Sequence, residues 1–224
     1  MRLTPTALLL AGLMGLCAVP AVMAHDVGDG QKGRDIDTVN ADIEIGRDAE
    51  AGDLDSVNGD IEVGSNSRVG DLDTVNGDIE LADGVKAGGA DSVNGKIHGG
   101  RDVLINGDID TVNGGIGFDA GSRVDGGLDT VNGTVKLTGT TVAKDIETVN
   151  GDIHLLDGSV VSGKIIVRKP NGNWCWFDCD DDKPVIEIGA NVEVTGGLLL
   201  EREVELKQHP SAKVGPIVYA YDKK

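Results

Sequence analysis

The chain has 224 residues, of which 34 are glycine and only six are aromatic, and its 38 acidic residues outnumber the 20 basic ones to give a net charge of −18. An acidic surplus of this size opposes binding to nucleic acid, anionic lipid or acidic polysaccharide, and is compatible with cations, basic partners or solubility alone. Abundant glycine without the triplet period of collagen is typical of a turn-rich all-β chain, and the length allows one domain.

The first 24 residues predict a secretory signal peptide. Arg2 supplies the positive start, residues 8–19 are apolar, and Val22-Met23-Ala24 precede a cut before His25. The apolar stretch is too short for a membrane-spanning helix. We therefore expect a periplasmic or secreted, cell-envelope location with no membrane span in the mature chain. Residues 25–34 are polar and glycine-rich, and predict a flexible leader.

A unit of about 18 residues then repeats along the chain. In one copy, Leu54 and Val57 are apolar, a turn follows at Asn58, and residues 60–63 alternate polar and apolar. Three short strands and three corners fit in such a unit. This predicts an all-β, single-stranded parallel β-helix of about 18 residues per coil, right-handed by analogy with other β-helices. The asparagine of the unit recurs at steps of 18, 18, 18, 19, 19 and 18 residues, at Asn40, Asn58, Asn76, Asn94, Asn113, Asn132 and Asn150.

Equivalent residues of successive coils are expected to lie above one another, roughly 4.8 Å apart, so that stacked coils share one core. The asparagines are expected to point inward at a corner and to form a structural ladder of amide hydrogen bonds along the axis. Two apolar columns are predicted to fill the core: Ile43, Ile61, Ile79, Ile97, Ile116, Val135 and Ile153, and Val39, Val57, Val75, Val93, Val112, Val131 and Val149.

Acidic residues form columns as well. Like charges one coil apart repel by about 1 kcal/mol in water and by about 3 to 4 kcal/mol at an effective dielectric constant of 20. Either one basic residue per coil relieves a solvated acidic face, or Ca²⁺ binds. The glycine-aspartate nonapeptide of calcium-binding β-rolls is absent, so we expect a solvated face and no cofactor. The acidic positions are Asp42, Glu44, Asp60, Glu62, Asp78 and Glu80, and a second column of Asp37, Asp55, Asp73, Asp91, Asp110, Asp129 and Glu147.

The period is interrupted once, by residues 168–184, and resumes at residues 185–188. We therefore predict a β-helix over 35–216 with one loop excursion, and a final strand or cap over 217–224. Cys175 and Cys179 are expected to form a disulfide in an oxidising compartment. The loop is either a lid packed on the solenoid or a recognition loop. Its candidate binding residues are Trp174, Trp176, Phe177, Asp178, Asp180, Asp181 and Asp182.

No catalytic constellation stands out. His98 and His154 are predicted to lie three coils apart, roughly 14 Å, which is too far to bind one metal. Carboxylates at the separation that glycosidases use recur in every coil and are not specific. The acidic columns are interrupted at Lys96, His98 and Arg101, which is where a site would be expected if the chain were an enzyme. We predict that it is not an enzyme and that no metal is bound.

The repeated T/S-V-N-G-D-I-E-V unit, at residues 56–63 and, with a final leucine, at 74–81, resembles a bacterial family of β-strand repeats of unknown function described as adhesin-like. The resemblance covers residues 35–165 and implies an envelope-associated parallel β-helix without assigned catalytic residues. The coil period is also similar to that of bactofilins, which polymerise, although bactofilins lack the signal peptide and the acidic cysteine loop.

The function expected from these features is that of an exported, non-enzymatic scaffold or adhesin-like binding module. Its partner would be an envelope protein or a glycan. The alternatives are a polymer-forming scaffold that associates end to end, and a carbohydrate-active β-helix enzyme.

Overall fold

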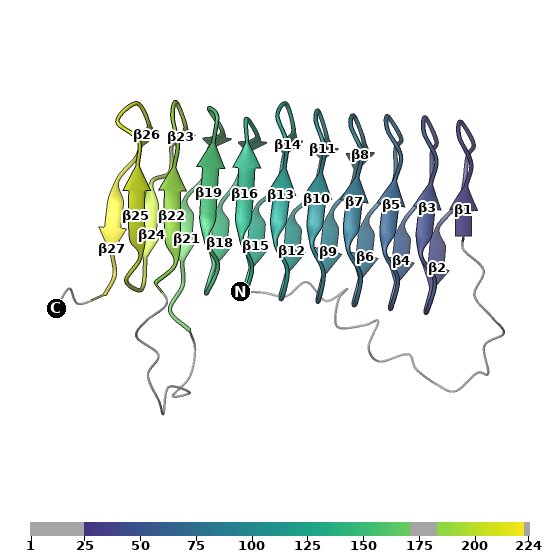
Figure 1. Ribbon diagram of the computed structural model, residues 1–224, viewed down its shortest axis with the longest axis horizontal. Coiled ribbons are helices and arrows are strands. Elements are labelled where there is room, and N and C mark those ends of the chain that lie inside the picture. Colours follow the sequence, from purple (N-terminus) through teal and green to yellow (C-terminus); the bar gives the residue numbers. More distant parts are fainter. Residues whose placement is uncertain (1–24, 171–182, 222–224) are drawn as a thin grey trace.

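The computed structural model describes residues 25–170 and 183–221, in which parallel strands stack as a solenoid of about ten coils (Figure 1). The predicted parallel β-helix is confirmed. The predicted signal peptide, the candidate loop residues 174–182 and the predicted Cys175–Cys179 disulfide lie outside the described residues.

Three sheets, which we call A, B and C, form the walls of the solenoid, and every strand pairs in parallel with its equivalent in the next coil. Sheet A contains β1 (His25–Val27), β3 (Ile43–Ile45), β5 (Ile61–Val63), β7 (Ile79–Leu81), β10 (Ile97–Gly99), β13 (Ile116–Phe118), β16 (Val135–Thr138), β19 (Ile153–Leu156), β22 (Val185–Ile188) and β25 (Glu205–Gln208).

Sheet B is shorter, and isolated bridges through Lys32, Glu50 and Arg68 extend it to the first coil. Its strands are β8 (Lys86–Ala87), β11 (Leu104–Ile105), β14 (Arg123–Val124), β17 (Thr141–Val142), β20 (Val160–Val161), β23 (Glu193–Val194) and β26 (Lys213–Val214). Sheet C contains β2 (Ile36–Thr38), β4 (Leu54–Ser56), β6 (Leu72–Thr74), β9 (Ala90–Ser92), β12 (Ile109–Thr111), β15 (Leu128–Thr130), β18 (Ile146–Thr148), β21 (Ile165–Val167), β24 (Leu198–Leu200) and β27 (Ile217–Tyr219).

The register keeps equivalent residues in file. Ile61 pairs with Ile79, and Ile79 with Ile97, and all three side chains are fully buried. Within β5, the first and third residues point into the core and the middle one points out, as alternation requires. No single coil could bury its inner residues alone, so the stacking itself creates the core.

Residues 25–34 are part of the solenoid, and the prediction of a flexible leader is wrong. β1 pairs with β3, which places Asp26 outside beside Glu44 and Val27 inside beside Ile45. The Oδ1 of Asp29 accepts a hydrogen bond from the N–H of Arg47 at 2.8 Å. The polar and glycine residues of this segment form corners of the first coil. β1 has one apolar residue that points inward, Val27, so the sequence shows no clear apolar alternation here.

The predicted valine column is not part of the core. Val39 is 45% exposed, and the later valines are half-buried. The threonine or serine before each valine takes the inner position of sheet C, as Ser56 and Thr74 show. Its buried hydroxyl is satisfied, because Thr74 Oγ1 donates to the carbonyl of Gly59 at 3.2 Å. A hydroxyl that bonds the corner of the preceding coil is therefore preferred there over a methyl group.

The seven asparagines form one continuous ladder, but they are exposed at the corner and do not point inward as expected. Each amide nitrogen donates to the Oδ1 of the asparagine in the preceding coil, over 2.8–2.9 Å. The last oxygen, on Asn150, accepts a hydrogen bond from Arg202 at 2.8 Å. Hydrogen bonds between coils, not burial, account for the asparagine at this position.

Phe118, the largest fully buried side chain among the described residues, is accommodated by a glycine. Phe118 belongs to an inner column of sheet A whose order is Leu81, Gly99, Phe118 and Leu137, so its two direct neighbours are Gly99 and Leu137. A Cβ placed on Gly99 would overlap the aromatic ring. The large residue of one coil therefore fills the space that the small residue of the previous coil leaves.

Candidate functional site

Most aspartates at the corners of the coils accept hydrogen bonds that link one coil to the next. Asp42 Oδ1 accepts the N–H of Asp60 at 3.0 Å, and Asp60 Oδ1 accepts the N–H of Asp78 at 2.8 Å. The carboxylate of one coil thus satisfies a backbone donor of the next. The hydrogen bond from the N–H of Gly127 lowers the pKa of Asp108, and Lys144 adds to this. The aspartates that bond a backbone N–H one coil further along are Asp29, Asp35, Asp42, Asp53, Asp60, Asp71, Asp78, Asp83, Asp108, Asp145 and Asp152.

A second acidic set runs along the outside of sheet C, where successive carboxyl groups lie side by side in register. Burial, with the charges of neighbouring carboxylates, raises the pKa of Asp73 and Asp110 to about 7. Burial likewise raises the pKa of Asp55 and Asp129 to about 6. Near neutral pH some of these groups retain a proton, which relieves the repulsion expected from the sequence.

The sheet C column ends in an ion-pair cluster. Arg168 donates to both oxygens of Glu147, at 2.8 and 3.0 Å, and to Glu201 at 2.8 Å. The hydrogen bond from Arg168 lowers the pKa of Glu201. In the next coils the column continues with Ile166 and Leu199, so the acidic surface stops at this cluster.

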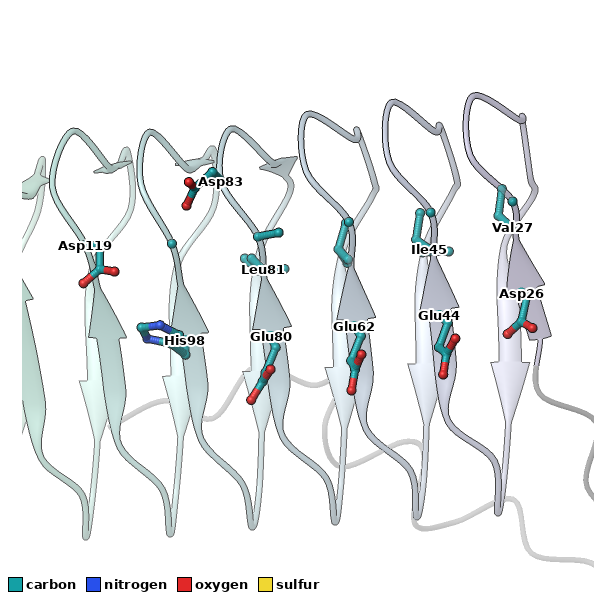
Figure 2. Close-up of a pocket in the computed structure, with 16 residues that line it drawn as sticks. Asp26, Val27, Glu44, Ile45, Glu62, Glu80, Leu81, Asp83, His98 and Asp119 are labelled. Atoms are coloured by element: carbon teal, nitrogen blue, oxygen red, sulfur yellow. The ribbon is translucent and has the colours of Figure 1, made fainter.

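The third acidic set is free of such contacts. Glu44, Glu62 and Glu80 are the middle residues of β3, β5 and β7, and all three are exposed. Within the described part of the chain, none of them has a hydrogen bond or an ion pair. They point outward in file from sheet A, with Asp26 before them and His98 after them (Figure 2). These five side chains line a shallow hollow of about 610 Å³.

The same outer column becomes basic further along sheet A. After His98 and Gly117 it contains Lys136, then His154, whose Nδ1 lies 2.8 Å from Oε2 of Glu187. Lys207 in β25 closes the column and lies 3.2 Å from Glu205. The outer face of sheet A thus has an acidic first half, whereas its second half combines Lys136, His154 and Lys207 with Glu187. We refer to this face as the sheet A face.

The other predicted site residues do not come together in a catalytic arrangement. His98 lines the hollow, whereas the backbone N–H groups of Lys96 and Arg101 bond the corner carboxylates of Asp78 and Asp83. Over residues 25–170 and 183–221, no group of three or more histidine, cysteine, aspartate or glutamate side chains is placed to hold a metal ion. The same residues include no helix long and apolar enough to cross a membrane.

Comparison of the chain with protein-family models, with curated proteins and with solved structures found no match. Because no relative suggests a function, the exposed charges of the sheet A face are the feature from which a function can be inferred.

Proposed function

We propose that this protein is an exported, non-enzymatic β-solenoid that acts as a cell-envelope scaffold or adhesin-like binding module, and that it binds a cationic partner along the sheet A face. The observation that carries the proposal is the row of exposed carboxylates at Glu44, Glu62 and Glu80, which have no contact within the described fold. The corner aspartates accept backbone hydrogen bonds, and burial raises the pKa of four aspartates along sheet C, whereas this row has no such place in the fold.

The spacing of the row supports an extended partner. Neighbouring strands lie about 4.8 Å apart, so four successive carboxylates span about 14 Å. A chain carrying several amines or guanidinium groups can contact them together, and such contacts act mainly through attraction that salt screens. The regular wall supports a role in binding or support, because each coil repeats the same shallow surface. His209 Nδ1 lies 2.9 Å from Ser211 Oγ in the last coil, but both side chains are exposed in the turn between β25 and β26.

The test uses a defined probe, a ten-residue oligolysine, titrated into the purified protein at low and at high salt. Changing Glu44, Glu62 and Glu80 to glutamine should weaken binding by about tenfold or more, since each lost carboxylate removes one of several additive attractions. The matched control changes Asp48, Asp102 and Asp157 to asparagine. These aspartates have positive φ, a conformation that asparagine tolerates, and the control alters net charge equally.

Binding that survives the glutamine changes, or that falls equally in the control, would contradict the proposal. A pull-down from envelope extract with the same two variants then identifies the natural partner, and a variant lacking residues 171–182 tests whether the predicted recognition loop contributes.

A polymer-forming scaffold is the second candidate, and the C-terminal coil favours it. Leu206, Val214 and Ile217 are only partly buried, whereas their equivalents one coil earlier, such as Ile186 and Leu198, are fully buried. Strands β25, β26 and β27 end their sheets without a further described strand. An open edge of this kind can pair with another chain. Sedimentation velocity across protein concentration tests this, because a polymer continues to grow.

A further inference from the structure

We propose that the sheet A face binds a second copy of this chain, packed face to face in antiparallel order as a two-fold symmetric dimer, so that the lysines of one copy meet carboxylates of the other although each chain is acidic as a whole. The inference rests on the proposed function, because it uses the same face. Its basis is the order of charges along the outer column of sheet A. From the first coil to the tenth the column reads Asp26, Glu44, Glu62, Glu80, His98, Gly117, Lys136, His154, Glu187 and Lys207.

When the column is reversed, two of its five facing pairs join opposite charges and one joins like charges. In an antiparallel pair the first position faces the tenth, and so on toward the middle. Asp26 then faces Lys207, and Glu80 faces Lys136. Glu62 faces the imidazole of His154, whose Nδ1 lies 2.8 Å from Glu187 of its own chain. Each of these contacts occurs twice, as two-fold symmetry requires.

The centre of the column suits a two-fold axis. There, His98 of each copy faces Gly117 of the other. Gly117 has no side chain, which leaves room for an imidazole between the two sheets.

Equal spacing makes the antiparallel order the favoured one. Because the sheet A strands are in register, one match at the centre extends to both ends of the column. A parallel arrangement would instead set Glu44, Glu62 and Glu80 against themselves, and like charges facing each other across an interface are strongly unfavourable.

One pair opposes the dimer. Glu44 would face Glu187, and both are acidic. Glu187 lies 2.8 Å from His154 of its own chain, and the same imidazole faces Glu62 of the other copy. Asp60 and Asp78, just before β5 and β7, accept backbone N–H groups of the following coils. Asp83 and Asp119 also line the hollow and add negative charge beside the column.

The face is small for an interface. Ten strands at about 4.8 Å and three to four residues of width at about 3.3 Å give a patch of roughly 45 by 10 to 13 Å, or roughly 450 to 600 Å² per copy. Standard interfaces bury about 800 Å² per partner, so the contact belongs to the weak, reversible class. A contact that depends on charge pairs at this size should weaken as salt is raised.

The test is sedimentation velocity of the purified protein and of charge-reversed variants at low salt. The unchanged protein should form a dimer that dissociates as salt is raised. Glu80→Lys alone sets the new lysine against Lys136, and Lys136→Glu alone sets the new glutamate against Glu80, so each should weaken the dimer by about tenfold or more. Both positions are exposed, so the variants should fold, which circular dichroism verifies.

Two restorations make the test specific for the antiparallel order. The chain carrying both changes should dimerise again, because the pair is only exchanged. A mixture of the two single variants should form a heterodimer, because the lysine that replaces Glu80 in one copy then faces the glutamate that replaces Lys136 in the other. The control exchanges Glu193 and Lys213, a pair 3.8 Å apart in sheet B, and should leave the dimer unchanged.

An unchanged protein that remains monomeric at low salt would overturn the inference, as would single variants that do not recover on mixing, or a control that dissociates equally. The two proposals can fail separately. If the monomer still binds oligolysine through Glu44, Glu62 and Glu80, only the dimer is wrong, and if oligolysine does not bind either, the sheet A face is not a binding surface.

Discussion

An acidic residue in this repeat takes one of two roles according to its distance from the inner isoleucine. The residue just before it lies at a corner, where the short side chain of Asp42 or Asp60 reaches a backbone N–H of the next coil. The residue just after it lies in mid-strand and points outward, and there Glu44 and Glu62 bond nothing in the described chain. The sequence carries a signal for these two roles: the residue before the isoleucine is aspartate, and the residue after it is glutamate.

The asparagine ladder should stabilise the protein at each of its hydrogen bonds. Asn94→Ala removes two of them, the one donated to Asn76 and the one accepted from Asn113. We expect a loss of about 1 to 2 kcal/mol in the free energy of unfolding, measured by denaturant titration. Asn40→Ala removes only the bond from Asn58 at the end of the ladder, and should cost about half as much. Equal losses would show that the ladder bonds do not determine stability.

Gly99 and Phe118 should behave as a coupled pair. Gly99→Val forces a side chain into the ring of Phe118 and should cost about 1 to 3 kcal/mol. Phe118→Leu removes the ring, so the same valine should cost clearly less in that background. A double-mutant cycle of thermal or denaturant unfolding measures the coupling. If the two changes add without coupling, the ring does not occupy the space beside Gly99.

At the scale of single residues, the inward-facing columns could be predicted from the sequence only where the residue type is found almost solely in a core. The isoleucines alternate with charged residues, which determines their side of the strand. The valines and threonines could not be assigned in the same way, because valine suits a half-buried ridge and threonine can be buried once its hydroxyl bonds Gly59 or an equivalent carbonyl. The sequence does not specify where the backbone acceptor lies.

At the scale of elements, the carboxyl column of sheet C makes stability depend on pH. Burial raises the folded-state pKa of Asp73 and Asp110 to about 7, from the 3.8 of the free side chain. The folded protein therefore binds more protons than the unfolded chain between about pH 4 and pH 7, and stability is lost as pH rises through that range.

Melting temperatures at about pH 4.5 and about pH 7.5, on either side of most of this range, test the dependence. The unchanged protein should melt lower at the higher pH by an amount that the variant Asp73→Asn, Asp110→Asn reduces, because an amide carries no titrating charge. Ionisable groups other than these two aspartates are present in both proteins, so the comparison isolates the two substitutions. A variant that keeps the full difference between the two pH values would show that the dependence does not come from the sheet C column.

The strand before the loop excursion is secured by Arg168. It links Glu147 in β18 to Glu201 after β24. Arg168→Ala leaves the largely buried Glu147 without its partner and should lower the free energy of unfolding by about 1 to 3 kcal/mol, less than for a fully buried pair because Arg168 is partly exposed. Lys144→Ala breaks an exposed pair with Asp108 and should cost about 0.5 kcal/mol or less. Comparable losses in the two variants would remove the special role of Arg168.

For the whole molecule, the period predicted the stacking of coils, because only in-register stacking places seven equivalent asparagines in one file. The period could not show that Asp26 and Lys207 begin and end the same outer column, since residues 25–34 lack the repeat motif and the excursion shifts the numbering near Lys207. The charge order of the sheet A face, on which the proposed function rests, therefore emerged only from the structure.

The most direct test of this account measures distances along the solenoid axis. Spin labels at Arg68 and Thr141 in sheet B are four coils apart, and labels at Arg68 and Lys213 are seven coils apart. The native cysteines Cys17, Cys175 and Cys179 are changed to serine, and the labelled protein is diluted with unlabelled protein. Pulsed electron paramagnetic resonance should then give distances of about 19 Å and about 34 Å between the two pairs of labels, because each coil adds about 4.8 Å. Distances that do not grow with the number of coils between the labels would contradict in-register stacking, and with it the order of charges along sheet A.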